Sequence, residues 1–171
     1  MRRHWHTPWV STRTADLSDA DDDRLRPCVL PWRSFGAHSS FQGPASTVRC
    51  RDDNGLVRAA VQEPGLGRVL VVDGGGSLAT ALVGDNLAGI AAANGWAGVV
   101  VVGAVRDVVA LATTPIGVLA LGVVPRRGTG GGLGERDVAV AAGGVVVRPG
   151  AQVVADEDGV LVDVLHPDIS M

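Results

Sequence analysis

Asp85, Arg106 and Asp107 are the residues whose types and spacing favour a chemical role. Arg106 and Asp107 follow the apolar run Gly98–Val105, and Asp85 opens a helix-like stretch 21 positions before Arg106. A guanidinium stabilises developing negative charge, and a carboxylate binds a hard divalent cation. A helix N-terminus adds backbone N–H groups that hold an anion. Together these groups predict a site for a small anion beside a divalent metal.

The absence of lysine limits the chemistry that such a site can perform. All 15 basic residues are arginines, which excludes a Schiff base on a lysine side chain. Carbon–carbon bond cleavage would therefore need a metal ion to stabilise an enolate. Cys28 and Cys50 form no CxxC motif, and we interpret them as buried, reduced thiols of a cytoplasmic protein, with a disulfide or a metal site as the alternatives.

Composition favours a single domain and excludes several classes of protein. A chain of 171 residues with 46% hydrophobic residues, 24 glycines and no tyrosine builds its core from small and β-branched side chains, which favours a homo-oligomer. The net charge is −3, with both signs scattered, so we expect no direct nucleic-acid binding. Val108–Val124 is uncharged, but Thr113-Thr114-Pro115 interrupts it, so we expect no membrane span.

The element pattern predicts an α/β fold with a parallel core. Helical periodicity predicts helices over Asn54–Gln62, Asp85–Asn94 and Asp107–Thr113. Apolar runs predict buried strands over Ser46–Arg51, Arg68–Val72, Gly98–Val102 and Gly117–Leu121. The alternation implies β-α-β units with parallel pairing. Asp16–Asp21 adds a short helix or turn, for which aspartate and serine are the candidate caps.

The remainder of the chain predicts a β-meander and two tails. We expect a mobile loop over Gly128–Gly134, followed by strands joined through tight turns. These strands are predicted over Val138–Ala142, Val145–Arg148, Val153–Ala155 and Val160–Val162. Residues 1–14 are predicted as a flexible tail, although His4-Trp5-His6 within it could chelate a metal. The domain then spans residues 15–165, and residues 166–171 form a C-terminal tail.

Each part of the candidate site also has an ordinary structural interpretation. The loop Asp73-Gly74-Gly75-Gly76-Ser77 could help to hold the anion, and it follows a strand as a dinucleotide-binding turn does, but it lacks the GxGxxG spacing. Its ordinary interpretation is a turn whose glycines are needed only for positive φ. Asp85 can simply cap a helix, and Arg106 with Asp107 can be a surface ion pair. Their positions after adjacent predicted strands favour a ligand site, because open α/β sheets bind ligands there.

A series of short segments carries a family resemblance from about Thr14 to Val164. They include Phe41-Gln42-Gly43-Pro44, Gly84-Asp85, Asn94-Gly95-Trp96-Ala97-Gly98, Arg106-Asp107, Gly134-Glu135-Arg136-Asp137 and Ala155-Asp156-Glu157-Asp158-Gly159. In these segments the chain resembles the family of 4-hydroxy-4-methyl-2-oxoglutarate aldolases and regulators of ribonuclease activity A. Members of this family are sometimes labelled demethylmenaquinone methyltransferases.

The resemblance implies a fold, an assembly and an activity. The fold is of the swivelling β/β/α type in a single domain, and the assembly is a homotrimer or a hexamer with active sites near subunit boundaries. The activity is a lyase reaction dependent on Mg or Mn. It cleaves 4-hydroxy-4-methyl-2-oxoglutarate to pyruvate and decarboxylates oxaloacetate, both small 2-oxo acids, through a pyruvate enolate. The alternative is a non-catalytic protein that inhibits ribonuclease E.

The resemblance also implies roles for individual residues. Arg106 holds the keto oxygen and the enolate, Asp107 ligates the metal, and Asp85 orients a water that moves the proton. The implied substrate-binding set is Gly84, Asp85, Asn86, Leu87 and Arg106, with the first four acting through backbone N–H groups. Ala110 departs from the family pattern, which has a carboxylate three residues after Asp107. Glu135 or Asp156 of a neighbouring subunit are the candidates to replace that carboxylate.

Overall fold

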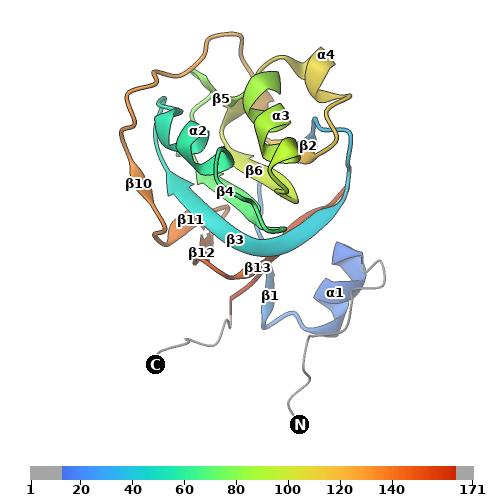
Figure 1. Ribbon diagram of the computed structural model, residues 1–171. Coiled ribbons are helices and arrows are strands. Elements are labelled where there is room, and N and C mark those ends of the chain that lie inside the picture. Colours follow the sequence, from blue (N-terminus) through green and yellow to red (C-terminus); the bar gives the residue numbers. More distant parts are fainter. Residues whose placement is uncertain (1–12, 165–171) are drawn as a thin grey trace.

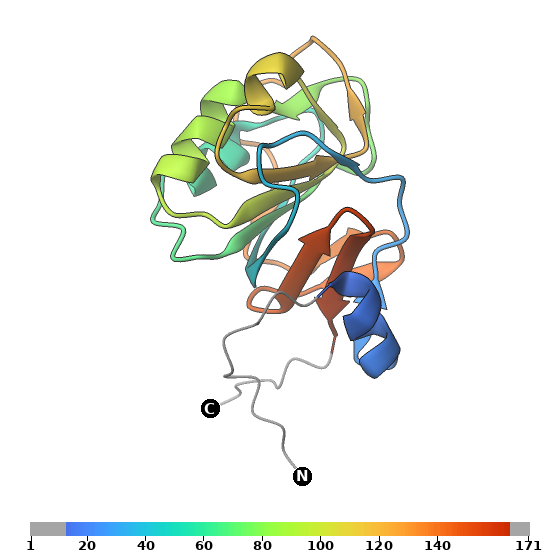
Figure 2. The same cartoon turned by 90° about the vertical axis from the view of Figure 1, so that its right-hand side faces the viewer.

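The computed structural model describes residues 13–164 and is built in three layers (Figures 1 and 2). Helices cover one face of a central sheet, and a second β-layer packs on its other face. This arrangement confirms the predicted α/β fold of the β/β/α type. The segment containing His4-Trp5-His6 lies outside the described residues, as do residues 165–171.

The central sheet contains the four parallel strands that the apolar runs predict. They are β3 (Phe41–Arg49), β4 (Val69–Asp73), β6 (Gly98–Val102) and β8 (Gly117–Ala120). These strands are neighbours in the order β3-β4-β6-β8, and all three pairings are parallel. Helices α2 (Gly55–Val61) and α3 (Asp85–Ala93) connect successive strands and lie on one face, as expected for β-α-β units.

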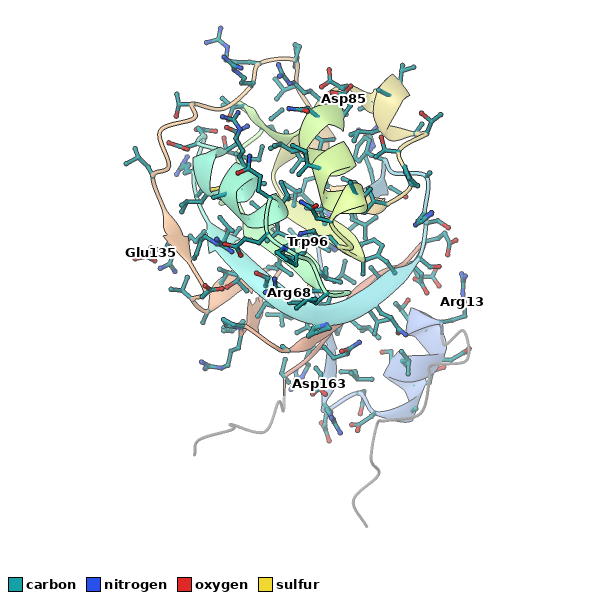
Figure 3. The ribbon with its side chains drawn as sticks, in the orientation of Figure 1. Arg13, Arg68, Asp85, Trp96, Glu135 and Asp163 are labelled. Atoms are coloured by element: carbon teal, nitrogen blue, oxygen red, sulfur yellow. The ribbon has the colours of Figure 1, made fainter. Side chains whose placement is uncertain are left out.

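Both faces of this sheet carry apolar side chains. Leu70 and Val72 pack under the helices, whereas Val69 and Val71 pack on the second β-layer. Successive strand residues point to opposite faces, so a strand covered on both sides is apolar at every position. Trp96 lies on the helical side, and the Arg68 guanidinium stacks over its indole ring, with Arg68 Cζ 4.7 Å from the ring centroid (Figure 3).

Strand β3 is long enough to take part in both β-layers, and it begins five residues before the predicted strand Ser46–Arg51. Its second half pairs in parallel with β4, and its first half pairs antiparallel with β13 (Gln152–Asp156). Strand β14 (Gly159–Asp163) follows β13 in a hairpin, and β1 (Leu25–Pro27) pairs with β14. Strands β11 (Val140–Ala142) and β12 (Val145–Val147) form a separate hairpin. The predicted single meander is therefore wrong, since β13 pairs with β3 and not with β12.

A small third sheet was not predicted. It consists of β5 (Ala81–Val83), β7 (Ala104–Val105) and β9 (Gly122–Val123), paired in parallel in the order β5-β7-β9. Gly103 separates β7 from β6, so the apolar run Gly98–Val105 continues beyond the predicted strand Gly98–Val102 and crosses from the central sheet into this one. The remaining elements are α1 (Thr14–Ala20), α4 (Val108–Leu111), β2 (Arg33–Ser34) and β10 (Glu135–Arg136).

Helix α1 corrects two predictions about the start of the fold. Its N-cap residue is Arg13, and neither aspartate nor serine caps it through a side chain. Instead the buried Asp156 carboxylate accepts hydrogen bonds from the Thr14 amide at 2.8 Å and the Thr14 hydroxyl at 2.7 Å. Thr14 is itself buried, so it belongs to the fold and not to the predicted tail.

The glycine-rich loop at residues 128–134 is anchored by Asp53, contrary to the expectation of mobility. The Asp53 side chain is buried, with 1% of the residue exposed, and accepts backbone hydrogen bonds from Gly132 at 3.0 Å and Leu133 at 3.1 Å. It also accepts one from Gly55 at the start of α2. A Cβ at Gly55 would lie 2.5 Å from the Gly132 nitrogen, so the loop packs directly on the helix.

Replacing Asp53 with asparagine is expected to lower the free energy of unfolding at pH 7 by about 1 to 2 kcal/mol. The Gly55 N–H, aided by the Leu133 and Gly132 N–H groups, holds the pKa of Asp53 below its ordinary value of 3.8 against the opposing effect of burial. A lowered folded-state pKa stabilises the fold above pH 3.8, and this stabilisation is lost as pH falls through the folded-state pKa. Urea unfolding from pH 7 to pH 2.5 should therefore show the two proteins converging at low pH.

The exposed Asp19 provides the control for this comparison. Asp19→Asn should leave the free energy of unfolding within about 0.5 kcal/mol of the parent at every pH. An Asp53→Asn protein that is as stable as the parent at pH 7 would show that the carboxylate does not anchor the loop.

Candidate active site

Strands β5 and β7 deliver Asp85 and Arg106 to the same edge. Asp85 follows β5 and begins α3, and Arg106 follows β7. The Arg106 amide donates a hydrogen bond to the Val83 carbonyl at 3.0 Å, which continues the parallel ladder up to the site. Asp85 lies at the outer end of α3, far from Asp163 and Arg13 (Figure 3). The predicted adjacency is confirmed, but the adjacent strands belong to the small sheet and not to the central one.

The Asp107 carboxylate lies at the N-terminus of α3. Its Oδ2 is 3.4 Å from the Asp85 amide nitrogen, which donates to it, and 3.7 Å from Arg106 Nε. A Cβ at Gly84 would lie 2.6 Å from the same oxygen. The missing side chain of Gly84 therefore creates the space that the carboxylate fills. The structure brings Gly84, Asp85, Arg106 and Asp107 together, as the sequence predicts.

The backbone of Asp107 turns the chain between β7 and α4. Its φ of 58° and ψ of 42° lie in the left-handed region, which aspartate and asparagine enter more readily than most residues. The predicted helix over Asp107–Thr113 is therefore too long, since Asp107 is its N-cap residue and α4 covers only Val108–Leu111. Strained backbone of this kind is common at ligand sites.

The first turn of α3 offers N–H groups to an anion. The first helical hydrogen bond runs from the Ala88 amide to the Gly84 carbonyl at 3.0 Å, so the Asp85, Asn86 and Leu87 amides precede it. Of these three, the Asp85 amide donates to the Asp107 carboxylate. Gly84 provides no side-chain cap. The Asn86 side chain is exposed, whereas the Leu87 side chain is buried in the core. Leu87 can therefore contribute to a ligand only through its backbone.

The donor set at this edge fits a hydrated hard cation. Asp107 supplies carboxylate oxygens, the ligand type of Mg²⁺ and Mn²⁺, and 41% of its side chain is exposed. Residues 13–164 contain no cluster of three or more His, Cys, Asp or Glu side chains with metal-binding geometry. A cation here would keep most of its water shell, as Mg²⁺ commonly does.

The other carboxylates considered for the site have different functions in this chain. Asp156 is buried and accepts the Thr14 hydrogen bonds that fasten α1. Glu135 pairs with Arg49 and lies at a different edge from Asp85 (Figure 3). The glycine loop after β4 is a structural turn: Gly75 and Gly76 have positive φ, and the Asp73 carboxylate accepts from the Gly75 and Ala141 amides.

The two cysteines offer no nucleophile at neutral pH. Both are buried, and they are not bonded to each other. Burial raises the pKa of Cys28 to about 12. Burial, reinforced by nearby carboxylates led by Asp53, also raises the pKa of Cys50 to about 12. A thiol with such a pKa is protonated at pH 7, so cysteine-based catalysis is excluded at these positions.

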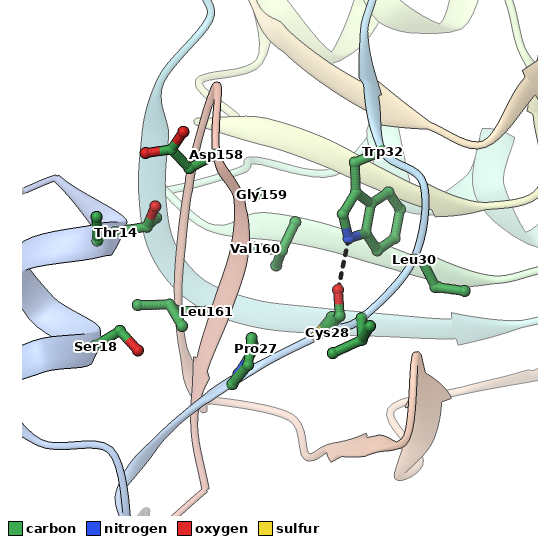
Figure 4. Close-up of a pocket in the computed structure, with 12 residues that line it drawn as sticks. Thr14, Ser18, Pro27, Cys28, Leu30, Trp32, Asp158, Gly159, Val160 and Leu161 are labelled. Carbon is green, nitrogen blue, oxygen red and sulfur yellow. Dashed lines mark hydrogen bonds between the residues drawn. The ribbon is translucent and has the colours of Figure 1, made fainter.

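A separate cavity of about 350 Å³ lies between α1, β1 and β14 (Figure 4). Trp32 closes one side of it, with its indole N–H donating to the Cys28 carbonyl at 2.9 Å. Helix α1 and the N-terminus of α3 lie at opposite ends of the molecule (Figure 1). This cavity is therefore not part of the Asp85 site.

The segment that follows β9 lies near the candidate site, which the sequence did not predict. The Pro125 carbonyl accepts a hydrogen bond from Arg106 Nη1 at 3.5 Å, and the Arg126 carbonyl accepts one from the Ala81 amide at 2.7 Å. The segment therefore runs along β5, beside the candidate site. The adjacent arginines at 126 and 127 were the only available signal, and no periodicity distinguished them from a surface loop.

Replacing Gly84 with alanine is expected to reduce activity at this site by at least 10-fold with little loss of stability. The backbone of Gly84 is extended, with φ −132° and ψ −167°, so alanine is not strained there. The added methyl group would instead displace the Asp107 carboxylate. A small displacement of a catalytic group lowers the reaction rate strongly, which is why a large loss of activity is expected. Substrate turnover measures the loss of activity, and thermal unfolding measures the change in stability.

Gly89, within α3, is the matched control for this substitution. A Cβ there meets no atom within 4 Å. Gly89→Ala should stabilise the protein by about 0.5 to 1 kcal/mol and leave turnover unchanged. Equal turnover in both variants would mean that the Gly84 space does not matter for function.

A family model described as RraA-like, Aldolase/RraA, matches residues 14–162, which is nearly the whole described chain. The chain belongs to this RraA-like aldolase family. A relative from Alkalilimnicola ehrlichii named "Putative 4-hydroxy-4-methyl-2-oxoglutarate aldolase" is 51% identical over 153 residues, covering 90% of this chain and 95% of the relative. The family predicted from the short sequence segments is thus confirmed.

Two solved structures show the same RraA-like fold. The RNA-processing inhibitor RraA from Thermus thermophilus is 49% identical, with a TM-score of 0.84, and the match covers 88% of this chain and 92% of that one. A Geobacillus kaustophilus protein described as an S-adenosylmethionine:2-dimethylmenaquinone methyltransferase is 47% identical, with a TM-score of 0.85, over 89% of this chain and 94% of that one. In the present RraA-like chain the glycine loop is a structural turn, without a dinucleotide-binding motif.

Proposed function

We propose that this RraA-like protein is a metal-dependent lyase that cleaves 4-hydroxy-4-methyl-2-oxoglutarate to pyruvate and decarboxylates oxaloacetate. The observation that carries the proposal is the grouping of Arg106, Asp107 and the first turn of α3 around the space left by Gly84. The name of the Alkalilimnicola relative supports the same reaction class. Both reactions pass through the enolate of pyruvate, so one site serves both.

The substrate binds through its 2-oxo acid end. Its carboxylate accepts hydrogen bonds from the backbone N–H groups of Gly84–Leu87, where the helix dipole favours negative charge. Arg106 donates to the keto oxygen and stabilises the charge that develops on it. In the aldol cleavage the C3–C4 bond breaks, and its electron pair becomes the enolate. A water oriented by Asp85 accepts the C4 hydroxyl proton and later returns a proton to C3.

In oxaloacetate the same bond breaks, carbon dioxide leaves, and protonation at C3 gives pyruvate. Asp107 would hold the Mg²⁺ or Mn²⁺ ion, with water as its other main ligand. When bound, the metal supplies Lewis-acid polarisation of the keto oxygen. The absence of lysine supports this choice over a Schiff base.

Pyruvate release from both substrates tests the proposal. Activity should disappear in the presence of a chelator and return with Mg²⁺ or Mn²⁺, and borohydride should trap no covalent adduct. Full decarboxylation in chelator, above the spontaneous rate, would contradict the metal mechanism.

We further propose that the protein assembles as a homotrimer or a hexamer. Light scattering measures the mass of the assembly in solution and tests this proposal.

The second candidate function is regulation of ribonuclease E by protein binding. The similarity to the Thermus RNA-processing inhibitor favours it, and so does Ala110, because relaxed catalysis tolerates the loss of a carboxylate. No helix among residues 13–164 is long and apolar enough to cross a membrane. Inhibition of ribonuclease E by a protein that lacks lyase activity with either metal would favour this function over the first.

Replacing Ala110 with glutamate is expected to raise Mn²⁺ affinity and lyase turnover by roughly 10-fold. Ala110 is exposed and occupies the third position of α4, after the N-cap residue Asp107. A glutamate at this position reaches back toward the N-cap residue, as in a capping box. Calorimetric Mn²⁺ titration and pyruvate release measure the effects.

Val109 supplies the control for this gain, because it is the neighbouring residue of α4 and is 86% exposed. Val109→Glu introduces the same charge at a position that a capping box does not use. Equal Mn²⁺ affinity in the two variants would indicate general charge attraction and not support of the metal.

A further inference from the structure

A groove of about 540 Å³ lies between β1 and β12 in the second β-layer (Figure 1). Within residues 13–164, each of these strands pairs on one side only: β1 is the outermost strand of its sheet, and β12 pairs with β11 alone. The Val29 amide donates to the Gly143 carbonyl at 3.2 Å, which joins the segment after β1 to the turn before β12. No residue of the candidate active site lines the groove, so it is a separate surface.

The free edge of β12 presents backbone groups to this groove. The register of the hairpin pairs Ala141 of β11 with Val146 of β12. The Ala141 amide donates to the Asp73 carboxylate at 3.1 Å, so its N–H points away from β12. Ala141 and Val146 are therefore a pair that exchanges no backbone hydrogen bonds, which alternates with bonded pairs along an antiparallel ladder. The N–H and C=O of Val146 then point away from β11, on the side of the groove that Val146 lines.

The side chains that line the groove are apolar or positively charged. Val29 is 75% exposed and Val146 is 53% exposed, so both offer apolar surface to a ligand. Arg26 and Arg148 also line the groove and are exposed, and neither forms an ion pair with another of the described residues. No acidic side chain of the described chain lines it. The groove therefore suits a ligand that combines carboxylates with an apolar side chain.

We infer that this groove binds an extended acidic segment of another protein, which adds as a strand to the free edge of β12. The Val146 N–H donates to the segment, and the Val146 C=O accepts from it, as in other cases of strand addition. An apolar side chain of the segment packs on Val146 and Val29, and its carboxylates pair with Arg26 and Arg148. The inference does not depend on the proposed lyase reaction.

Charge favours another protein over a second copy of this chain as the occupant. A free strand edge can pair with the same edge of a second copy. Pairing two copies through β12 would, however, bring a second Arg148 to the groove without a carboxylate to pair with it, and like charges across paired strands are destabilising. An acidic segment supplies the missing carboxylates.

Fluorescence anisotropy with labelled peptides and the full-length protein tests the inference. The probe is a seven-residue peptide with aspartate at both ends, valine at the centre and threonine elsewhere. It should bind at least about 10-fold more tightly than the same peptide with lysine at both ends, because the lysines would face the arginines. Methylating the central valine nitrogen removes the N–H that the Val146 carbonyl accepts and should weaken binding roughly 10-fold.

Protein variants locate the binding of the acidic peptide. Arg26→Gln and Arg148→Gln should each weaken it by roughly two- to fivefold, as expected for exposed ion pairs. Arg58→Gln is the matched control, because Arg58 is exposed on α2, on the helical face of the central sheet, and it should bind like the parent. Val146→Pro removes an N–H that β11 does not use, so the hairpin should persist while peptide binding falls roughly 10-fold.

Amide hydrogen exchange of Val146 gives a measurement on the unaltered protein, and it should slow when the acidic peptide binds. No binding of this peptide by the parent would overturn the inference, and so would equal affinity for the peptide with lysine ends. An unchanged exchange rate at Val146, or an equal loss of binding in Arg58→Gln, would overturn it as well. A lower mass for Val146→Pro than for the parent in light scattering would show that a second copy occupies the edge, contrary to the inference.

Discussion

Replacing Arg106 with alanine is expected to lower kcat for oxaloacetate decarboxylation by roughly 100-fold or more. Arg106 is the cation beside the Asp107 carboxylate and the Gly84 space, so it is the group placed to stabilise an enolate oxygen. Its side chain is 37% exposed, and its hydrogen bond to the Pro125 carbonyl is long at 3.5 Å. The loss of stability should therefore be at most about 1 kcal/mol.

Arg106→Lys tests whether charge alone is sufficient. Lysine keeps the positive charge but lacks the planar pair of donors, so it should recover little of the lost kcat. Arg148 is exposed in the turn between β12 and β13, so Arg148→Ala should behave like the parent in the same assay. Near-parental kcat in both Arg106 variants would indicate that Arg106 and Asp107 form only a surface ion pair.

Replacing Asp107 with asparagine is expected to abolish detectable Mn²⁺ binding and lower turnover by roughly 100-fold or more. Asparagine has nearly the same shape and also tolerates the left-handed backbone at this position, where φ is 58°. The substitution therefore removes the negative charge with little disturbance of the fold. Calorimetric Mn²⁺ titration reports the metal site directly, independently of turnover.

Asp107→Gly separates the function of the carboxylate from its backbone cost. A left-handed conformation costs a non-glycine residue about 1 to 2 kcal/mol, so glycine should preserve or raise the free energy of unfolding while Mn²⁺ binding is lost. Asp137 is the control, since it is exposed and also has a positive φ of 56°. Asp137→Asn should retain full Mn²⁺ binding. Strong Mn²⁺ binding by Asp107→Asn would place the metal elsewhere.

Apolar periodicity was sufficient to predict the central sheet and the helices that cover it. Residues 69–72 and Gly98–Val102 are apolar because both faces of these strands are covered, so burial leaves a direct record in the sequence. Helix α3 was predicted within one residue of its end. The pairing of β13 with β3 could not be predicted, because an antiparallel strand with an apolar face fits more than one partner until the layers pack.

The sequence by itself determined the residue types of the candidate site and their order, with Asp85 at a helix start and Arg106 and Asp107 after an apolar run. Only the tertiary structure decided which elements bring them together. Strands β5, β7 and β9 are two or three residues long, which is too short to show a periodicity. They form because three segments distant in the sequence pair with one another in parallel. That ladder places the Asp107 carboxylate over Gly84 and the Pro125 carbonyl beside Arg106, since hydrogen bonds between distant segments depend on packing and not on local pattern.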